Sequence, residues 1–285
     1  MVLVSGVVYG LQPLMFSQCY SQGANPVFMT IARNGAIAIL LFPVVLRKGG
    51  GFRVVIQHWK EFLCLCFVNM ITGVLLYGSY LHIATSIATS LHFLYPVIVT
   101  LLCLAVFHDK ASPRKLFCTF LCLVGTAFIL NLTERRISLM GVALAAGSSF
   151  TWALYIVWLD KLDLKDVSSE QLLFFITGGS CVLIAAVYHS SLPVTIAAIT
   201  PVGWAFVALA SVLVGLFGSI FFAVGVRCTD AQTSAIASTL EPVVSVAVGI
   251  LLMKEAFSLS TLIGSLCIVV AVFILALPPP QKHAP

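Results

Sequence analysis

The chain has 285 residues, of which 60% are hydrophobic and only 9% are charged. A soluble domain carries about 25% charged residues, so this composition excludes a water-soluble protein and predicts an integral membrane protein in a lipid bilayer. The formal net charge of +5 does not indicate nucleic-acid binding, because the basic residues lie in short segments between apolar runs, where lipid headgroups and membrane topology account for them.

The apolar runs predict ten transmembrane helices, because each run approaches the ~20 residues that a helix needs to cross a bilayer. The expected spans are residues 2–20, 27–46, 61–81, 85–107, 113–131, 138–159, 170–189, 201–226, 231–252 and 259–277. The first run has neither a positively charged start nor a small-residue cleavage site, so we expect a transmembrane helix there rather than a signal peptide.

An even number of spans puts both termini on one side of the membrane, and basic loops mark the cytoplasmic side. Loops on the side of the termini contain eleven basic residues, namely Arg47, Lys48, Arg53, Lys60, Lys110, Arg114, Lys115, Lys161, Lys165, Arg227 and Lys282. Loops on the other side contain three, namely Arg135, Arg136 and Lys254. We therefore expect both termini in the cytoplasm, and the short loops favour a bacterial inner (plasma) membrane.

The two halves of the sequence resemble each other. When the segment "ATSIATSLHFLYPV" is aligned with "DAQTSAIASTLEPV", Pro96 lies opposite Pro242. Each copy then holds five spans, and an odd number of spans inverts the second copy relative to the first. Inverted repeats are typical of secondary transporters, whose substrate site lies near the middle of the membrane between the repeats. We expect the first repeat in residues 1–134, the second in 135–278 and a cytoplasmic tail in 279–285.

Three segments carry a resemblance to a known family: "YPV…FHDKASPRK…GTAFIL" from Tyr95, "LEPV…LLMKEAFSLSTLIGSLCIVV" from Leu240, and "NPVFMTIARNGAIAILLF" around Arg33. With these segments the chain resembles the drug/metabolite transporter superfamily, specifically permeases with two tandem EamA-type domains. The resemblance implies an all-α membrane protein with ten transmembrane helices arranged as two inverted five-helix repeats. It also implies a transporter of small metabolites, often an exporter.

Polar residues within the expected spans tend to face the protein interior or a water-filled path, and helical spacing groups them on shared faces. The functional interpretation is a central cavity whose substrate-binding or coupling candidates are Gln12, Arg33, Asn69, Tyr77, Tyr80, His92, Trp152, Tyr155, Ser238 and Glu241. The alternative is structural, since hydroxyls can bond to their own helix carbonyls and tyrosines can anchor a helix at the membrane interface. Pro13, Pro96 and Pro242 are the expected kinks or hinges, because proline interrupts helical hydrogen bonding.

Glu241 is the only ionisable residue in the run Ala231–Met253. A charge at the bilayer centre costs at least ~2.5–3.5 kcal/mol. Three interpretations stay open: the carboxyl is protonated, it pairs with Arg33, or it lies in a wet cavity. In function it would couple transport to protons or bind a cationic group, and in structure it would fix the helix beside its proline. His92 is open to two interpretations, a proton-relay or substrate group and a neutral histidine bonded within the bundle.

The sequence favours a secondary transporter that moves a small organic metabolite, such as an amino acid or a drug, by alternating access. The resemblance implies that it is an exporter. The alternatives are an intramembrane enzyme and a non-transporting scaffold. We do not expect an enzyme, because HExxH and GxSxG are absent, and we expect no cofactor or metal, because the cysteines are scattered without a CxxC. The expected partners are the small-molecule substrate, the lipid bilayer and protons, for a monomer or a homodimer.

Overall fold

The computed structural model describes residues 1–49, 51–80, 82–83, 88, 91–109, 112–129, 138–161, 167–190, 192–253 and 259–277. Within these residues every regular element is a helix, as predicted, and there is no strand. In chain order the helices are α1 (Val2–Gly10), α2 (Gln12–Ser21), α3 (Pro26–Lys48), α4 (Gly51–Gln57), α5 (Trp59–Ser79), α7 (Tyr95–Ala105), α8 (Pro113–Ile129), α9 (Leu139–Lys161), α10 (Ser169–Val187), α11 (Leu192–Ala198), α12 (Pro201–Ala210), η1 (Ser211–Gly218, π-helical), α13 (Ser219–Cys228), α14 (Ala231–Ser238), α15 (Leu240–Met253) and α16 (Leu259–Ala276).

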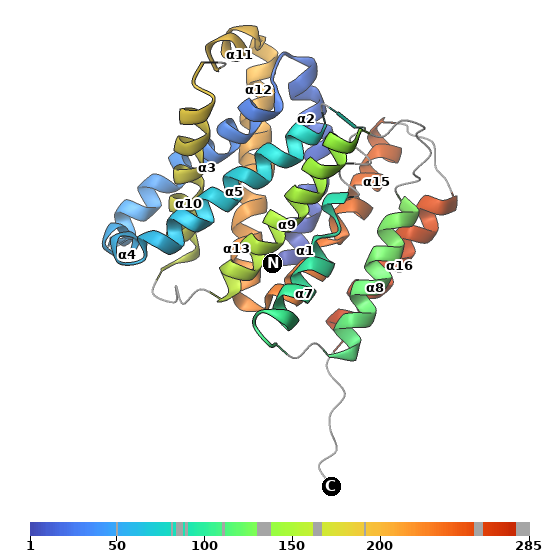
Figure 1. Ribbon diagram of the computed structural model, residues 1–285. Helices are drawn as coiled ribbons and strands as arrows, with labels where there is room; N and C mark the ends of the chain where they lie inside the picture. Colours follow the sequence, from blue (N-terminus) through green and yellow to red (C-terminus); the bar gives the residue numbers. More distant parts are fainter. Residues whose placement is uncertain are drawn as a thin grey trace.

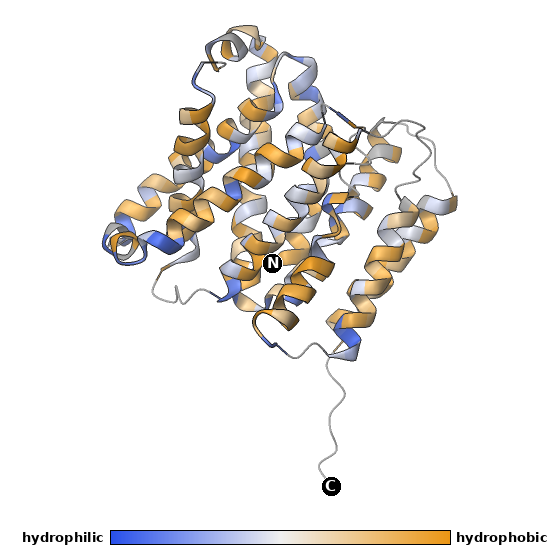
Figure 2. Cartoon of the chain, in the orientation of Figure 1, coloured by the Kyte–Doolittle hydropathy of each residue, from blue (hydrophilic) through white to orange (hydrophobic). Residues whose placement is uncertain are grey.

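Seven helical stretches among the described residues are long and apolar enough to cross a membrane. They are Val2–Ser21, Pro26–Lys48, Trp59–Ser79, Leu139–Lys161, Ser169–Val187, Pro201–Cys228 and Ala231–Leu252. The other three predicted spans contain α7, α8 and α16, which are described over 11, 17 and 18 residues. Figure 2 shows apolar residues along all of these helices. Seven of the predicted spans are thus confirmed by length and composition, while the count of ten stays a prediction.

Side-chain caps start several of these helices. Asn25 accepts a hydrogen bond from the backbone of Phe28 at 2.8 Å, and Pro26 occupies the first turn of α3. Ser168 and Gln171 form a reciprocal capping box at the start of α10. Such caps satisfy backbone N–H groups that have no partner inside the helix. The caps therefore define where the apolar helices begin.

The three prolines singled out in the sequence all follow a break in a helix. Helix α1 gives way to α2 at Leu11, just before Pro13, and α14 gives way to α15 at Thr239, just before Pro242. Helix α7 begins one residue before Pro96. A proline cannot donate the backbone hydrogen bond to the residue four positions earlier, and its ring clashes with that carbonyl, so each helix is interrupted on the N-terminal side of the ring.

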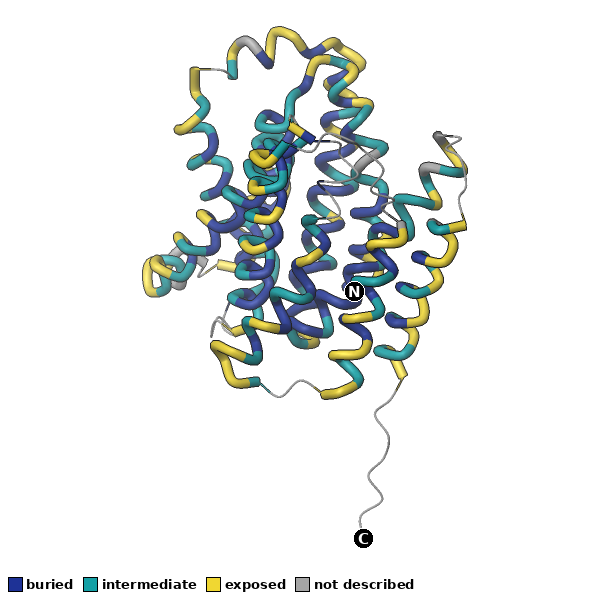
Figure 3. Tube along the Cα trace, turned by 45° about the vertical axis from the view of Figure 1, so that its right-hand side comes forward, coloured by how far each residue is buried: buried dark blue, intermediate teal, exposed yellow. Residues whose placement is uncertain are grey.

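The helices form one bundle in which α1 lies against elements of the second half of the chain. Helix α1 packs on α13, α14, α15 and η1, while α5 packs on α9 and α10, and α3 on α10. Helices α8 and α16 pair with each other and lie side by side at one edge of the bundle (Figure 1). Buried residues follow the inner faces of the helices and exposed ones the outer faces (Figure 3). The two halves of the sequence therefore meet around α1.

Two glycines of η1 let this helix approach α1 and α3 closely. A Cβ atom at Gly215 would lie 2.7 Å from Cγ of Arg33, and one at Gly218 would lie 2.7 Å from the ring of Tyr9. Neither position has room for a side chain without a shift of its neighbour. The local π-helical turn, a feature often found at functional sites, thus lies directly behind Tyr9 and Arg33.

Some sequence-based predictions fall outside the described residues. These are the boundary between the repeats at residues 134 and 135, the tail 279–285, and six of the basic residues used for the topology. The six are Lys110, Arg135, Arg136, Lys165, Lys254 and Lys282.

Candidate functional site

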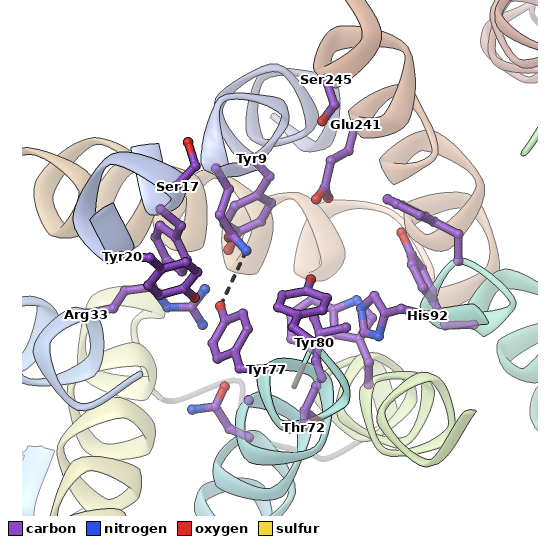
Figure 4. A pocket seen from close by; sticks show the side chains of 18 residues that line it. Tyr9, Ser17, Tyr20, Arg33, Thr72, Tyr77, Tyr80, His92, Glu241 and Ser245 are labelled. Atoms are coloured by element: carbon purple, nitrogen blue, oxygen red, sulfur yellow. Dashed lines mark hydrogen bonds between the residues drawn. The ribbon is translucent and has the colours of Figure 1, made fainter. Parts of the chain in front are cut away.

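A cavity of about 180 Å³ lies in the interior of the bundle, between helices of both halves (Figure 4). Its lining residues are Tyr9, Gln12, Phe16, Ser17, Tyr20, Arg33, Asn69, Thr72, Gly73, Leu76, Tyr77, Tyr80, His92, Phe93, Tyr95, Trp152, Glu241 and Ser245. Eight of the ten sequence-based candidates are among them. The lining is rich in aromatic rings and carries one long cation and one carboxylate.

Two candidates lie elsewhere. Tyr155 lines a much smaller cavity next to Arg33 and stacks on Trp152. Ser238 does not line the main cavity, and its hydroxyl donates to the carbonyl of Ser234 at 2.7 Å within α14. Grouping Ser238 with Glu241 on one face assumed a continuous helix, whereas the break at Thr239 changes the rotation between them.

Several lining residues were not among the candidates. Thr72 and Leu76 lie on the same stripe of α5 as Asn69 and Tyr77, and spacings of three and four residues along that helix could have identified them. Tyr95 gave no such signal. It lies at the start of α7, immediately after a break that the sequence does not locate.

Arg33 reaches the cavity from α3 without a direct ion pair to another described residue. Its Nε is buried and makes no hydrogen bond, and within the described part of the chain its guanidinium is in no ion pair. Its aliphatic stem lies against Gly215. A guanidinium held in this way has its fork of N–H donors available for a ligand.

Glu241 enters the cavity from the first turn of α15. Figure 4 shows its carboxylate pointing into the space that Tyr9 and Tyr80 also border. In the described residues it accepts no hydrogen bond and forms no ion pair. Glu241 and Arg33 face the same cavity without a direct ion pair in this conformation, and pairing with Arg33 stays one of the three interpretations.

Hydrogen bonds hold the polar wall of the cavity in place. The amide of Gln12 donates to the hydroxyl of Tyr77 at 3.3 Å, which Figure 4 marks with a dashed line. The amide of Asn69 donates to the hydroxyl of Ser180 at 3.0 Å. These bonds join α2 to α5 and α5 to α10, so the polar groups are oriented before any ligand arrives.

Aromatic rings stack on one another beside the cavity. Trp152 stacks on Tyr155 with ring centroids 5.0 Å apart and on Phe222 with centroids 5.3 Å apart. Tyr9 lies 6.4 Å from Phe222, centroid to centroid, and its hydroxyl is 3.1 Å from that of Ser219. Helices α1, α9 and α13 thus meet in a layer of stacked rings.

His92 is anchored within the bundle and also borders the cavity. Its Nδ1 lies 3.0 Å from the hydroxyl of Ser148, and its ring lies 5.6 Å from that of Tyr95. The bond to Ser148 fits a structural histidine and the place in the cavity lining fits a substrate or relay group, so both interpretations stay open.

The model of the EamA-like transporter family matches residues 1–131 and 139–277. The chain belongs to the EamA-like transporter family. The two matches correspond to two tandem repeats and agree with the resemblance to the drug/metabolite transporter superfamily. The predicted repeat boundary at 134 and 135 falls between the matches and stays a prediction.

Relatives of this EamA-family protein are described as transporters. It is 26% identical over 238 residues to an uncharacterized transporter of Synechocystis sp., covering 80% of this chain and 68% of the relative. It is 24% identical over 244 residues to an uncharacterized transporter of Archaeoglobus fulgidus, covering 85% of each. The family and its apolar helices make the chain an integral membrane protein, and the family and the names of its relatives indicate a transporter.

A solved structure has the same fold. A crystal structure with 15% sequence identity superposes with a TM-score of 0.81, covering 96% of this chain and 95% of the other. At that identity the likeness concerns the fold alone.

Proposed function

We propose that this protein carries a small organic molecule with both a carboxylate and an ammonium group, such as an amino acid, across the membrane by alternating access between its repeats. The observation that carries the proposal is that Arg33 and Glu241 line one cavity and are in no ion pair within the described part of the chain. Opposite charges that line one cavity without a direct ion pair between them match a ligand that carries both.

The chemistry of the two groups supports this ligand class. A guanidinium presents a planar fork that binds a carboxylate through two hydrogen bonds, and a carboxylate accepts from an ammonium group. The rings of Tyr9, Tyr77 and Trp152 offer faces to an ammonium and to an organic side chain. A ligand with only one charge would bring that charge near the group of like sign, which reduces its affinity.

The size of the cavity favours a small metabolite over a drug. Sites for drug-sized ligands occupy about 300–1,000 Å³, whereas this cavity has a volume of about 180 Å³. The direction that we propose is export, as in the permeases that the sequence resembles.

The proposal also includes the number of transmembrane helices, their orientation and the location of the protein. We propose ten transmembrane helices, in which α7, α8 and α16 belong to the remaining three spans, arranged as two inverted five-helix repeats. Both termini would face the cytoplasm of a bacterial cell, in the inner membrane, with protons as the candidate coupling ion and a monomer or a homodimer as the assembly. The basic residues on the side of the termini support this orientation.

Uptake into liposomes tests the function. The purified protein would be reconstituted and given a labelled amino-acid mixture under an imposed pH gradient. We expect saturable uptake by the wild type and its loss in Glu241→Gln. The matched control is Glu61→Gln, which changes a carboxylate in the first turn of α5, outside the cavity, and should retain uptake. Equal uptake by wild type and Glu241→Gln would mean that Glu241 has a structural role and not a transport role. No uptake of any amino acid would contradict the proposed substrate class.

A further inference from the structure

Three lysine–carboxylate ion pairs join the two repeats to each other. In each pair one partner belongs to residues 1–131 and the other to residues 139–277. The pairs are Lys48–Glu170 at 3.0 Å, Asp109–Lys161 at 2.7 Å and Lys115–Asp230 at 2.8 Å. The other two ion pairs of the described residues join sequence neighbours within one repeat.

The three pairs lie at the same end of the bundle. They involve the last residue of α3, the first turn of α10, the residues after α7, the end of α9, the first turn of α8 and the cap of α14. Figure 1 shows the ends of α7 and α9 and the start of α8 along its lower edge. This is the end for which the loop charges predict a cytoplasmic location.

Backbone acceptors add to the same connection. The guanidinium of Arg114, in the first turn of α8, donates to the carbonyls of Ile274, Leu275 and Leu277 at the end of α16, at 2.7 Å in the case of Leu275. The side-chain amide of Gln171 donates to the carbonyl of Gly49 at 3.0 Å. Both links again run from one repeat to the other.

The cavity lies toward the opposite end. On α5, which starts at Trp59 near the ion pairs, the lining begins only at Asn69 and continues to Tyr80 beyond the far end of the helix. Glu241 lies 11 residues beyond Asp230, which corresponds to about 16 Å at 1.5 Å per residue. The cavity therefore lies in the half of the bundle away from the ion pairs.

We propose that these three ion pairs form a gate that holds the repeats together at the cytoplasmic end and opens as a unit when the cavity turns toward that side. The proposal rests on alternating access between the repeats, as put forward above. It assigns a transport role to six charged residues that lie outside the cavity and touch no ligand.

The pair of Lys115 and Asp230 connects the gate to the cavity most directly. Asp230 also accepts hydrogen bonds from the backbone N–H and the hydroxyl of Thr233, at 2.9 and 2.7 Å, and thereby caps α14. Helix α14 leads through the break at Thr239 to Glu241. Movement of Asp230 away from Lys115 therefore takes with it the helix that precedes the carboxylate of the cavity.

The far end of the bundle is joined differently. There, among the described residues, the links between repeats are uncharged: Asn25 donates to Thr195 at 2.7 Å and Thr200 donates to the side chain of Gln22 at 2.5 Å. Partly exposed ion pairs contribute only modestly to stability. Such pairs can be broken and re-formed in every cycle, and three together can still bias which end is closed.

Hydrogen exchange of the full-length protein in lipid nanodiscs tests the gate without a substrate. In Lys115→Gln we expect exchange to rise about two- to five-fold at the starts of α8 and α14. We also expect a rise at the end of α9 and the start of α10, which carry the other two pairs. The charge swap Lys115→Asp with Asp230→Lys should restore protection at the start of α8, the end of α9 and the start of α10, whereas the start of α14 also loses its Asp230 cap and is left out of this comparison. Lys60→Gln, which removes an exposed lysine whose ammonium lies over the Trp59 ring, is the matched control and should change nothing.

Three results would overturn the gate. They are a rise confined to α8 and α14, no rise at all, and a charge swap that leaves exchange high. A variant-free check is to raise the ionic strength on wild type, which screens exposed pairs and should give the same four-site pattern. Because exchange needs no substrate, failure here would leave the transport proposal standing, and absent uptake with the expected exchange pattern would reject the substrate class alone.

Discussion

Replacing Arg33 by methionine should separate binding from folding. The guanidinium of Arg33 has a buried Nε without a hydrogen bond, and it makes no ion pair in the described part of the chain. Methionine keeps an unbranched stem against Gly215, where the present contact is tight. The change therefore removes a charge and its donors without stranding a protein acceptor.

The expected magnitudes differ for the two properties. Burying a charge that has no direct ion-pair partner costs free energy, so the melting temperature of Arg33→Met should equal or exceed that of wild type. Hydrogen bonds to a charged group contribute about 1.5–3 kcal/mol, and 1.4 kcal/mol corresponds to tenfold in affinity. The Kd for an amino acid should therefore rise about 10- to 100-fold.

The assay pairs thermal unfolding with isothermal titration of phenylalanine on the same detergent-solubilised samples. Arg114→Met is the matched control, because its guanidinium donates to carbonyls at the end of α16. That variant should melt at a lower temperature and retain its affinity. The reasoning is refuted if Arg33→Met loses stability as Arg114→Met does while its Kd stays that of wild type.

Further predictions concern packing, the cavity wall and pH. Gly10→Ala puts a methyl group 2.5 Å from a valine side chain of α15 and should cost about 1–3 kcal/mol of stability in a denaturation experiment, whereas Gly35→Ala, whose nearest neighbour is 3.4 Å away, should be tolerated. Tyr77→Phe removes the hydroxyl that accepts the 3.3 Å hydrogen bond from the α2 amide. Because such a neutral bond contributes about 1 kcal/mol, the Kd for phenylalanine should change less than about tenfold, and a larger change would mean that the phenol binds the ligand directly. Burial raises the pKa of Asp230, but hydrogen bonds, first that from Lys115, outweigh burial and lower this pKa below its usual value. The stabilising effect of this carboxylate is thus present above the ordinary aspartate pKa of about 3.9 and is lost as the pH falls through the lower folded value. The difference in melting temperature between wild type and Asp230→Asn should accordingly stay constant from about pH 8 to 5 and vanish only in stronger acid, and a difference that disappears near neutral pH would contradict this.

The sequence was sufficient for the helices and for most of the cavity. Long apolar runs predict spans such as Pro26–Lys48 and Leu139–Lys161, because a helix satisfies the backbone polar groups of a single segment in lipid by itself. The polar stripe from Asn69 to Tyr80 also lines the cavity, since a membrane helix turns such groups toward the protein interior.

The other features of the cavity depend on tertiary packing, which the sequence alone does not reveal. The breaks near Pro96 and Pro242 change the rotation along a span, so Tyr95 enters the cavity and Ser238 does not. The depths of Arg33 and Glu241 in the membrane follow from their positions in their spans. Their lateral separation does not, because it depends on how closely helices approach, for instance where Gly215 admits the stem of Arg33.

The most direct test of a ligand held between opposite charges is equilibrium binding of three related compounds to the wild-type protein. Phenylalanine carries both charges, phenylalaninamide only the ammonium, and N-acetylphenylalanine only the carboxylate. Since each missing charge removes hydrogen bonds of about 1.5–3 kcal/mol, we predict that phenylalanine binds at least about tenfold more tightly than either analogue. Equal affinity for phenylalanine and one of its singly charged analogues would contradict the joint role of Arg33 and Glu241.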